Sequence, residues 1–221
     1  MFQALLILHI IAGFTSIILF WLPIFTKKGG NLHVRIGSVY VYAMWVVVIS
    51  AAILSVIRIF QGYYEMAIFL GYLSLITAKP LWLGISILKK TTQRFWKIKL
   101  MLESLIFIGG LGLFILGILW SGHSVSILAL IFGSLGILSI FELINTGNKK
   151  LKRNKIQLHL AEMLTSGIAG YTAFLAFGAR QFLESLLNGY WAVVPWVLPT
   201  VAGIIAIRMM IPKYGTSATS S

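Results

Sequence analysis

Long apolar runs are the feature that most restricts how this sequence can fold. Seven stretches, each about 20 or more residues long and mostly apolar, follow one another with only short polar breaks between them. A helix of roughly 20 apolar residues crosses the hydrocarbon core of a bilayer. Charged residues make up 10% of the chain, against about 25% in soluble domains. The expected spans cover about residues 3–25, 36–59, 65–88, 98–120, 124–146, 157–179 and 190–211.

These runs predict an all-α, polytopic membrane protein built as one seven-transmembrane-helix bundle. The runs and their connections account for residues 1–213, so no separate soluble domain is expected. Residues 214–221 form a polar C-terminal tail that carries no folding signal.

Basic residues alternate between the polar breaks and predict the orientation of the bundle. Fifteen of the eighteen Lys and Arg residues follow the first, third, fifth and seventh runs, whereas Arg58 and Arg180 fall on the opposite side and Lys79 lies inside the third run. The positive-inside rule therefore places the N-terminus outside and the C-terminus in the cytoplasm. The fifteen residues are Lys27, Lys28, Arg35, Lys89, Lys90, Arg94, Lys97, Lys99, Lys149, Lys150, Lys152, Arg153, Lys155, Arg208 and Lys213.

The same rule explains the formal net charge of +13 without a nucleic-acid partner, which is not expected. The expected partners of the basic breaks are membrane lipids, with anionic headgroups at the cytoplasmic face.

Four ionisable residues fall within or at the ends of the predicted spans, where lipid does not explain them. Lys79, Glu103, Glu142 and Glu162 all belong to the cytoplasmic half. Lys79 lies ten residues before Lys89, which places it about 15 Å in from the basic loop. An ion pair with Glu103 or Glu142 of a neighbouring span is the expected solution, because isolated charges are costly in a membrane. Such a pair is either structural or functional.

Histidines supply a second group of candidates. Asn31 is a plausible N-cap, so His33 falls in the first turn of a span, where the helix dipole favours a neutral imidazole. His159 lies at the same membrane face on another span. If these spans are neighbours, His33 and His159 are expected to ligate one haem iron, with Arg35 and Lys79 available for its propionates.

Small residues follow these histidines at helical spacing. His9 precedes Gly13 by four residues, and His33 precedes Gly37 by four. A third groove is expected beside His159. It would be formed by Ser166, Gly167 and Gly170. His9 and His123 would form a weaker outer pair. Glycines of the fourth and fifth spans are expected to bring helices close together. They are Gly109, Gly110, Gly112, Gly117, Gly133 and Gly136.

Residues 8–13, 27–44 and 159–177 resemble a family of uncharacterised bacterial multi-span membrane proteins that carry a domain of unknown function. The three segments contain His9, His33 and His159. The resemblance implies a multi-pass protein of the bacterial inner membrane but brings no activity. The chain is also loosely similar to membrane cytochromes of the b561 and ferric-reductase kind. Those proteins carry two histidines on one span and this chain does not, so the similarity implies at most one haem, at the cytoplasmic side.

Three functions stay open on the sequence, and no enzyme class is assigned. The first is haem-b binding for electron transfer, with a redox partner or a second copy of the chain as partner. The second is a proton- or ion-coupled transporter that uses Lys79, Glu103 and Glu142, with Glu162 also in the pathway. The third is a zinc-dependent intramembrane hydrolase in which His33, His159 and Glu162 hold the metal and Glu103 acts as the general base.

Overall fold

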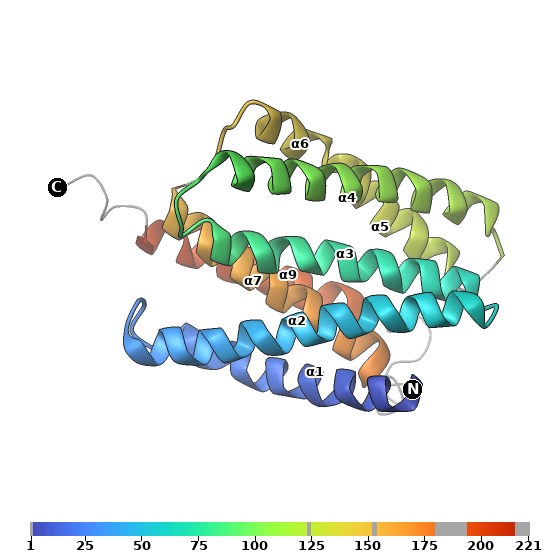
Figure 1. The fold of residues 1–221 in the computed structure, drawn as a ribbon, viewed down its shortest axis with the longest axis horizontal. Helices are drawn as coiled ribbons and strands as arrows, with labels where there is room; N and C mark the ends of the chain where they lie inside the picture. The colour runs from blue at the N-terminus through green and yellow to red at the C-terminus, as the bar shows by residue number, and fades with distance from the viewer. Residues whose placement is uncertain (1, 123–124, 152–153, 180–193, 215–221) are drawn as a thin grey trace.

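The computed structural model describes residues 2–122, 125–151, 154–179 and 194–214. Within these residues all regular structure is helical and no strand occurs, which confirms the all-α prediction (Figure 1). The helices are α1 (Phe2–Phe25), α2 (Asn31–Phe60), α3 (Tyr64–Ser86), α4 (Gln93–Leu119), α5 (Ser126–Leu138), α6 (Ile140–Gly147), α7 (Lys155–Ala173), the π-helical turn η1 (Phe174–Gly178), α9 (Val194–Met210) and the short η3 (Pro212–Tyr214).

Six helical segments of the described residues are long and apolar enough to cross a membrane. They are α1, α2, α3, α4, the pair α5–α6 and α7 with η1. Helix α9 is equally apolar but has 17 described residues. The predicted span 190–211 begins outside the described residues, and so does nearly all of the predicted tail. Large apolar side chains such as Ile18 and Ile108, each 65% exposed, cover the outside of the bundle as expected for a surface that faces lipid.

The fifth predicted span is interrupted rather than continuous. Ser139 separates α5 from α6, and its backbone N–H bonds to the Gly136 carbonyl three residues back. The backbone N–H groups of Glu142 and Leu143 both bond to the Ser139 carbonyl at 2.9 Å. This tight local turn divides the span into two short helices near its middle.

Helix α3 lies at the centre of the bundle. It packs against α2, α4 and α7, while α1 packs mainly on α2, and α5 on α4. Half of the residues in the most apolar 18-residue stretch of α3 are buried, compared with 11% in the corresponding stretch of α1. Residues on several faces of α3 therefore point at other helices, which makes it the element most able to position a buried site.

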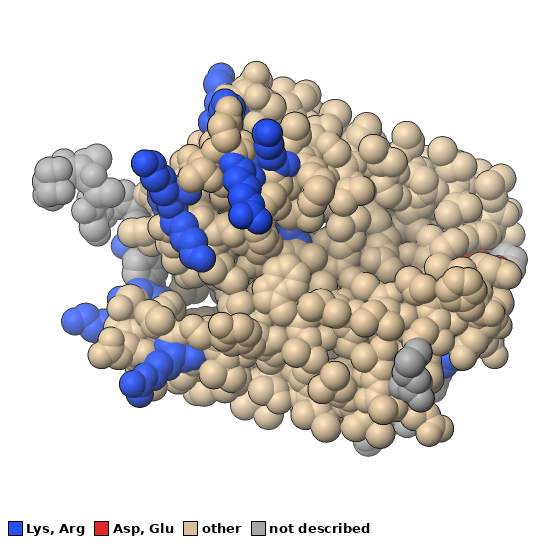
Figure 2. Space-filling view, viewed as in Figure 1, with Lys and Arg blue, Asp and Glu red and all other residues tan. Residues whose placement is uncertain are grey.

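The connections α1–α2, α3–α4 and α6–α7 lie at the same end of the bundle (Figure 1). Figure 2 shows Lys and Arg gathered at this end, while most of the visible surface is uncharged. We call it the basic end. It is the part of the fold in which the alternating basic breaks of the sequence come together.

Glycines bring α4 and α5 into contact, as predicted from the small residues of these spans. A Cβ built on Gly110 would lie 2.6 Å from Gly136 Cα, and one on Gly133 would lie 2.6 Å from the backbone nitrogen of Phe114. Side chains at these positions would force the helices apart. Gly112 differs, because a Cβ there would meet nothing within 4 Å.

Candidate functional site

A buried charge network joins three helices in the half of the bundle nearer the basic end. Lys79 of α3 places its Nζ 3.1 Å from Glu103 Oε1 of α4, which confirms the expected ion pair. Glu103 is completely buried, and its second oxygen, Oε2, has no hydrogen-bond partner among the residues that the structure describes. Glu142 of α6 acts on Lys79 electrostatically, but the direct partner of Lys79 is Glu103.

Lys99 is the member of this network that the sequence interpretation missed. The sequence places Lys99 among the basic residues of a loop, yet it is only 3% exposed. Its Nζ lies 3.2 Å from the same Glu103 Oε1 and donates to Thr146 Oγ1 at 2.5 Å. The i,i+4 spacing of Lys99 and Glu103 on one helix was the available signal. Its burial depends on α6, which supplies Thr146.

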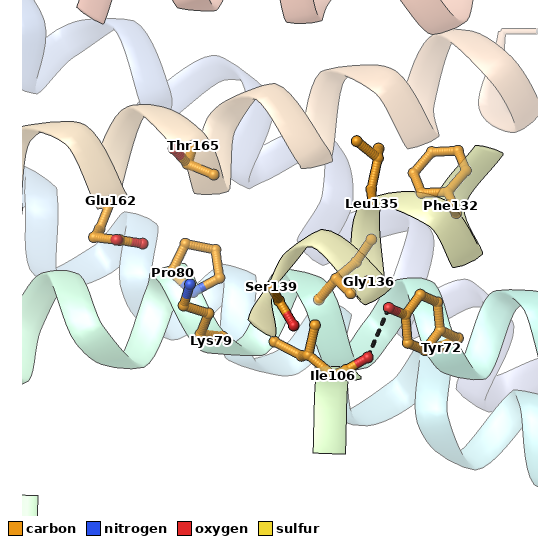
Figure 3. A pocket seen from close by; sticks show the side chains of 11 residues that line it. Tyr72, Lys79, Pro80, Ile106, Phe132, Leu135, Gly136, Ser139, Glu162 and Thr165 are labelled. Atoms are coloured by element: carbon orange, nitrogen blue, oxygen red, sulfur yellow. Dashed lines mark hydrogen bonds between the residues drawn. The ribbon is translucent and has the colours of Figure 1, made fainter. Parts of the chain in front are cut away.

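A cavity of about 200 Å³ lies beside the network. Figure 3 shows that α3, α4, α5, α7 and the break at Ser139 all contribute to its lining. Five polar residues line it among apolar ones. They are Tyr72, Lys79, Ser139, Glu162 and Thr165. A cavity with two opposite charges and three hydroxyls is unusual inside an apolar bundle, where buried polar groups are expected to be paired.

Two of these polar groups have unmet bonding capacity. Ser139 Oγ is buried and has no hydrogen-bond partner in the described residues. Glu162 lines the cavity and makes no hydrogen bond or ion pair within the described part of the chain, although it acts on Lys79 electrostatically. The sequence predicted that Glu162 belongs to the polar group but not that it faces a cavity.

The two histidines of the basic end are held by backbone carbonyls. The His33 Nδ1–H donates to the Pro23 carbonyl of α1 at 3.1 Å, and the His159 Nδ1–H donates to the Gly84 carbonyl of α3 at 2.5 Å. A carbonyl only accepts, so Nδ1 carries the proton in each ring. The Nε2 atoms have no hydrogen-bond partner among the described residues.

His33 and His159 lie at the same level of the bundle. Helices α2 and α7 both begin at the basic end and run in the same direction (Figure 1). Tyr40 and Ser166, each seven residues after one of the histidines, join the helices through a buried hydrogen bond of 2.8 Å. Two helical turns span about 10.5 Å, so both imidazoles lie that far back from this bond. They are close enough to interact electrostatically.

The groove expected beside His159 is largely filled. Phe20 packs so closely on Gly167 that a Cβ there would collide with its ring. A Cβ on Gly170 would meet Met44 at 3.7 Å. By contrast, Gly37, one turn after His33, has nothing within 4 Å of its Cβ direction. The sequence could not predict this difference, because the filling side chains come from other helices.

Basic side chains near the histidines differ from those predicted. Arg35 is exposed and Lys79 is bound to Glu103, so neither is directed to His33 by a contact in the structure. Lys28 is nearer, because it acts electrostatically on His159. Its Nζ donates to the carbonyls of Pro23 and Ile24 at the end of α1. Partial burial lowers the pKa of Lys28.

A hydrogen bond between helices accounts for the position of His9 inside the first span. Its Nδ1 lies 2.8 Å from Ser50 Oγ of α2, and Ser50 is buried. A Cβ built on Gly13 would meet nothing within 4 Å, so no other helix packs on this predicted small neighbour of His9. His123, the other member of the predicted outer pair, lies outside the described residues. No group of three His, Asp or Glu side chains that could hold a metal ion occurs in the residues that the structure describes.

The fold and the site together define a helical protein of membrane type with a partly open cavity, lined by five polar and six apolar or glycine residues, beside a buried charge network. Comparison with protein-family models, curated proteins and solved structures finds no match to this chain. Arguments about its function therefore come from the residues and the geometry described above.

Proposed function

We propose that the chain is a multi-pass carrier that moves a small ion, or a solute coupled to one, through the cavity beside Lys79 and Glu162. The observation that carries the proposal is the cavity itself, which brings Lys79 and Glu162 together with three hydroxyl side chains in an otherwise apolar bundle. Ionisable residues in such positions mark ion pathways and proton relays in membrane proteins. This is the transport alternative raised by the sequence, with Lys99 added to Lys79, Glu103, Glu142 and Glu162.

The interrupted span supports a carrier over a purely structural ion pair. Transporters commonly place their sites beside discontinuous helices near the middle of the membrane, where backbone groups become available to a ligand. The break at Ser139 leaves the backbone groups of Ser139 itself bonded, but it places the Ser139 hydroxyl on the cavity lining, where this hydroxyl has no hydrogen-bond partner among the described residues. A structural pair needs only one Lys and one Glu, and it needs no cavity.

The proposal includes seven spans, with the N-terminus outside and the C-terminus in the cytoplasm. Helix α9 is the seventh, and its 17 described residues extend about 25 Å. The basic end then faces the cytoplasm, where anionic headgroups are its expected contacts. The bacterial inner membrane is proposed from the family resemblance alone.

Flux in proteoliposomes tests the carrier. We expect liposomes that contain the protein to move Na⁺ or H⁺ down an imposed gradient faster than empty liposomes. Glu162→Gln should lower this rate at least about tenfold, as expected when a transported ion loses its counter-charge. Glu65→Gln removes a carboxylate at the start of α3 and serves as the matched control. Rates equal to those of empty liposomes for both ions would refute the proposal.

Haem-b binding for electron transfer remains a second candidate because of the paired imidazoles. Two histidines at one level, each with Nδ1 held by a carbonyl and Nε2 without a bond, match the donors of axial haem ligation. His33 and His159 would hold the iron, and the haem would supply one-electron transfer. A zinc site would need Glu162 or another third ligand beside the two histidines, and no such group of three side chains occurs among the described residues, so the hydrolase is not proposed.

Absorption spectroscopy tests this second candidate. Protein purified from haem-supplied cells should show a Soret band, and His33→Ala or His159→Ala should remove it. His9→Ala is the control, because the His9 ring bonds to Ser50 instead. A colourless wild-type protein would eliminate haem binding without affecting the carrier proposal.

A further inference from the structure

The charges around the cavity are unevenly distributed between the two carboxylates. Glu103 receives two ammonium groups on a single oxygen, from Lys79 at 3.1 Å and Lys99 at 3.2 Å. Glu162 receives none within the described residues. Lys79, Lys99 and Glu103 therefore carry one positive charge more than Glu103 balances, while Glu162 beside them has no direct partner in the described part of the chain.

Of the two lysines, Lys79 is the one whose ammonium group can move from Glu103 to Glu162. Its side chain is 20% exposed and lines the cavity, whereas the Lys99 side chain is 4% exposed and is also held by Thr146. If Lys79 turned from Glu103 to Glu162, Glu103 would keep Lys99 as its partner. Neither carboxylate would then be left without a counter-charge, so the exchange avoids the usual cost of an unpaired buried ion.

The hydroxyls of the cavity favour a positive ligand. Tyr72 donates its proton to the Ile106 carbonyl at 3.0 Å, as Figure 3 shows. Thr165 donates its proton to the Ala161 carbonyl at 2.8 Å. What these two oxygens have left to offer a ligand is lone pairs. Hard cations prefer such oxygen ligands, and Na⁺ sites in transporters use them.

The geometry points to a binding site for a small monovalent cation, Na⁺ or a proton, on the Glu162 carboxylate, with Lys79 as its built-in competitor. When no cation is bound to Glu162, the Lys79 ammonium forms an ion pair with Glu162. When the cation is bound, Lys79 forms an ion pair with Glu103 instead. The inference rests on the carrier proposed above and identifies Glu162 as the group that binds its coupling cation. A bound Na⁺ would also draw on the oxygens of Ser139 and Thr165.

Several charged groups face this site and set its charge balance. They are Lys79 on α3, Lys99 and Glu103 on α4 and Glu142 on α6. His159 lies one helical turn before Glu162 on α7.

Cation titration of the full-length protein in nanodiscs tests the site. NaCl is exchanged for choline chloride at constant ionic strength, at several pH values, and thermal stability is recorded. We expect stabilisation by Na⁺, or by low pH if the cation is a proton. Glu162→Gln should abolish it, whereas Glu65→Gln should leave it unchanged. Lys79→Met should bind the cation about tenfold more tightly, because the competitor is gone. A response in Glu162→Gln equal to that of wild type, or weaker binding by Lys79→Met, would overturn the inference.

Chemical labelling of the wild-type protein provides a test that needs no variant. A hydrophobic carbodiimide modifies protonated carboxyl groups within membranes, and mass spectrometry locates the product. We expect modification of Glu162, with slower modification when Na⁺ or higher pH removes the proton. Glu103 should stay unmodified, because it is fully buried between two ammonium groups. Modification of Glu103 in preference to Glu162 would overturn the inference.

The two proposals fail in different ways. A cation response that depends on Glu162, combined with no flux in liposomes, would keep the site and remove the carrier. Flux that is retained in Glu162→Gln would keep a transport function and remove this site from it.

Discussion

Replacement of Glu103 by glutamine is expected to be the most damaging single change in the charge network. Glu103 is fully buried and is the shared partner of Lys79 and Lys99. The neutral amide leaves Lys99 buried without an opposite charge, and removing one partner of a buried pair costs about 3–5 kcal/mol. Lys79→Met should cost far less, because Glu103 keeps Lys99.

Reversible unfolding in mixed detergent micelles, followed by circular dichroism, measures these free energies. Glu65→Gln is the control for loss of one carboxylate elsewhere on the bundle. The double variant Lys99→Met with Glu103→Leu removes the buried pair while Lys79 retains Glu162 nearby. Apolar replacement of a buried pair is often neutral, so we expect the double variant to recover most of the loss.

Two results would refute this reasoning. If Glu103→Gln is no less stable than Glu65→Gln, the network does not hold buried charges as described. If the double variant is as unstable as Glu103→Gln, the penalty does not come from an uncompensated Lys99.

Two further predictions concern helix packing. Gly136→Leu should destabilise the bundle by about 1–3 kcal/mol in the same unfolding assay, because a Cβ there would meet the Tyr72 hydroxyl and the Gly110 backbone. Gly112→Leu should be neutral, and equal effects of the two changes would contradict the described α4–α5 contact. Tyr40→Phe should cost about 0.6 kcal/mol, the average for hydrogen bonds between membrane helices, since Ser166 also donates to the Met163 carbonyl. A loss above about 2 kcal/mol would show that this bond does more than join α2 to α7.

Some of the candidate site was predictable because membranes penalise charge. Lys79 stood out as a lysine far from the basic loop, and a partner on a neighbouring span was the simplest way to lower its cost. The choice between Glu103 and Glu142 was not predictable. It depends on which face of α4 and α6 meets α3, and apolar runs carry almost no signal about rotation.

Lys99 is a residue for which the sequence predicted solvent exposure and the structure shows burial. Its position beside a basic loop suggested a solvated charge, and charge counting alone gave no reason to separate it from its neighbours. Thr146, on another helix, accepts a hydrogen bond from the Lys99 ammonium, and Glu103 forms the ion pair with it. Burial of this side chain follows from contacts more than 40 residues away in the sequence, which local patterns do not encode.

The histidines were located by sequence but not characterised by it. The prediction that the second and sixth spans bring His33 and His159 together is consistent with the Tyr40–Ser166 bond. The predicted groove beside His159 was wrong in its packing, because Phe20 occupies it. Small residues show where another element could approach, and only the assembled helices show which one does.

The sequence by itself determined an all-helical chain of membrane type and the ends at which basic residues collect. Both follow from the length of the apolar runs and the high cost of charge in lipid, which act on each segment separately. Tertiary structure alone decided the break at Ser139, the shared role of Glu103 and the cavity that Glu162 faces. These features arise from how helices are rotated and packed against one another, and in lipid that is settled by shape and a few polar contacts rather than by hydrophobic pattern.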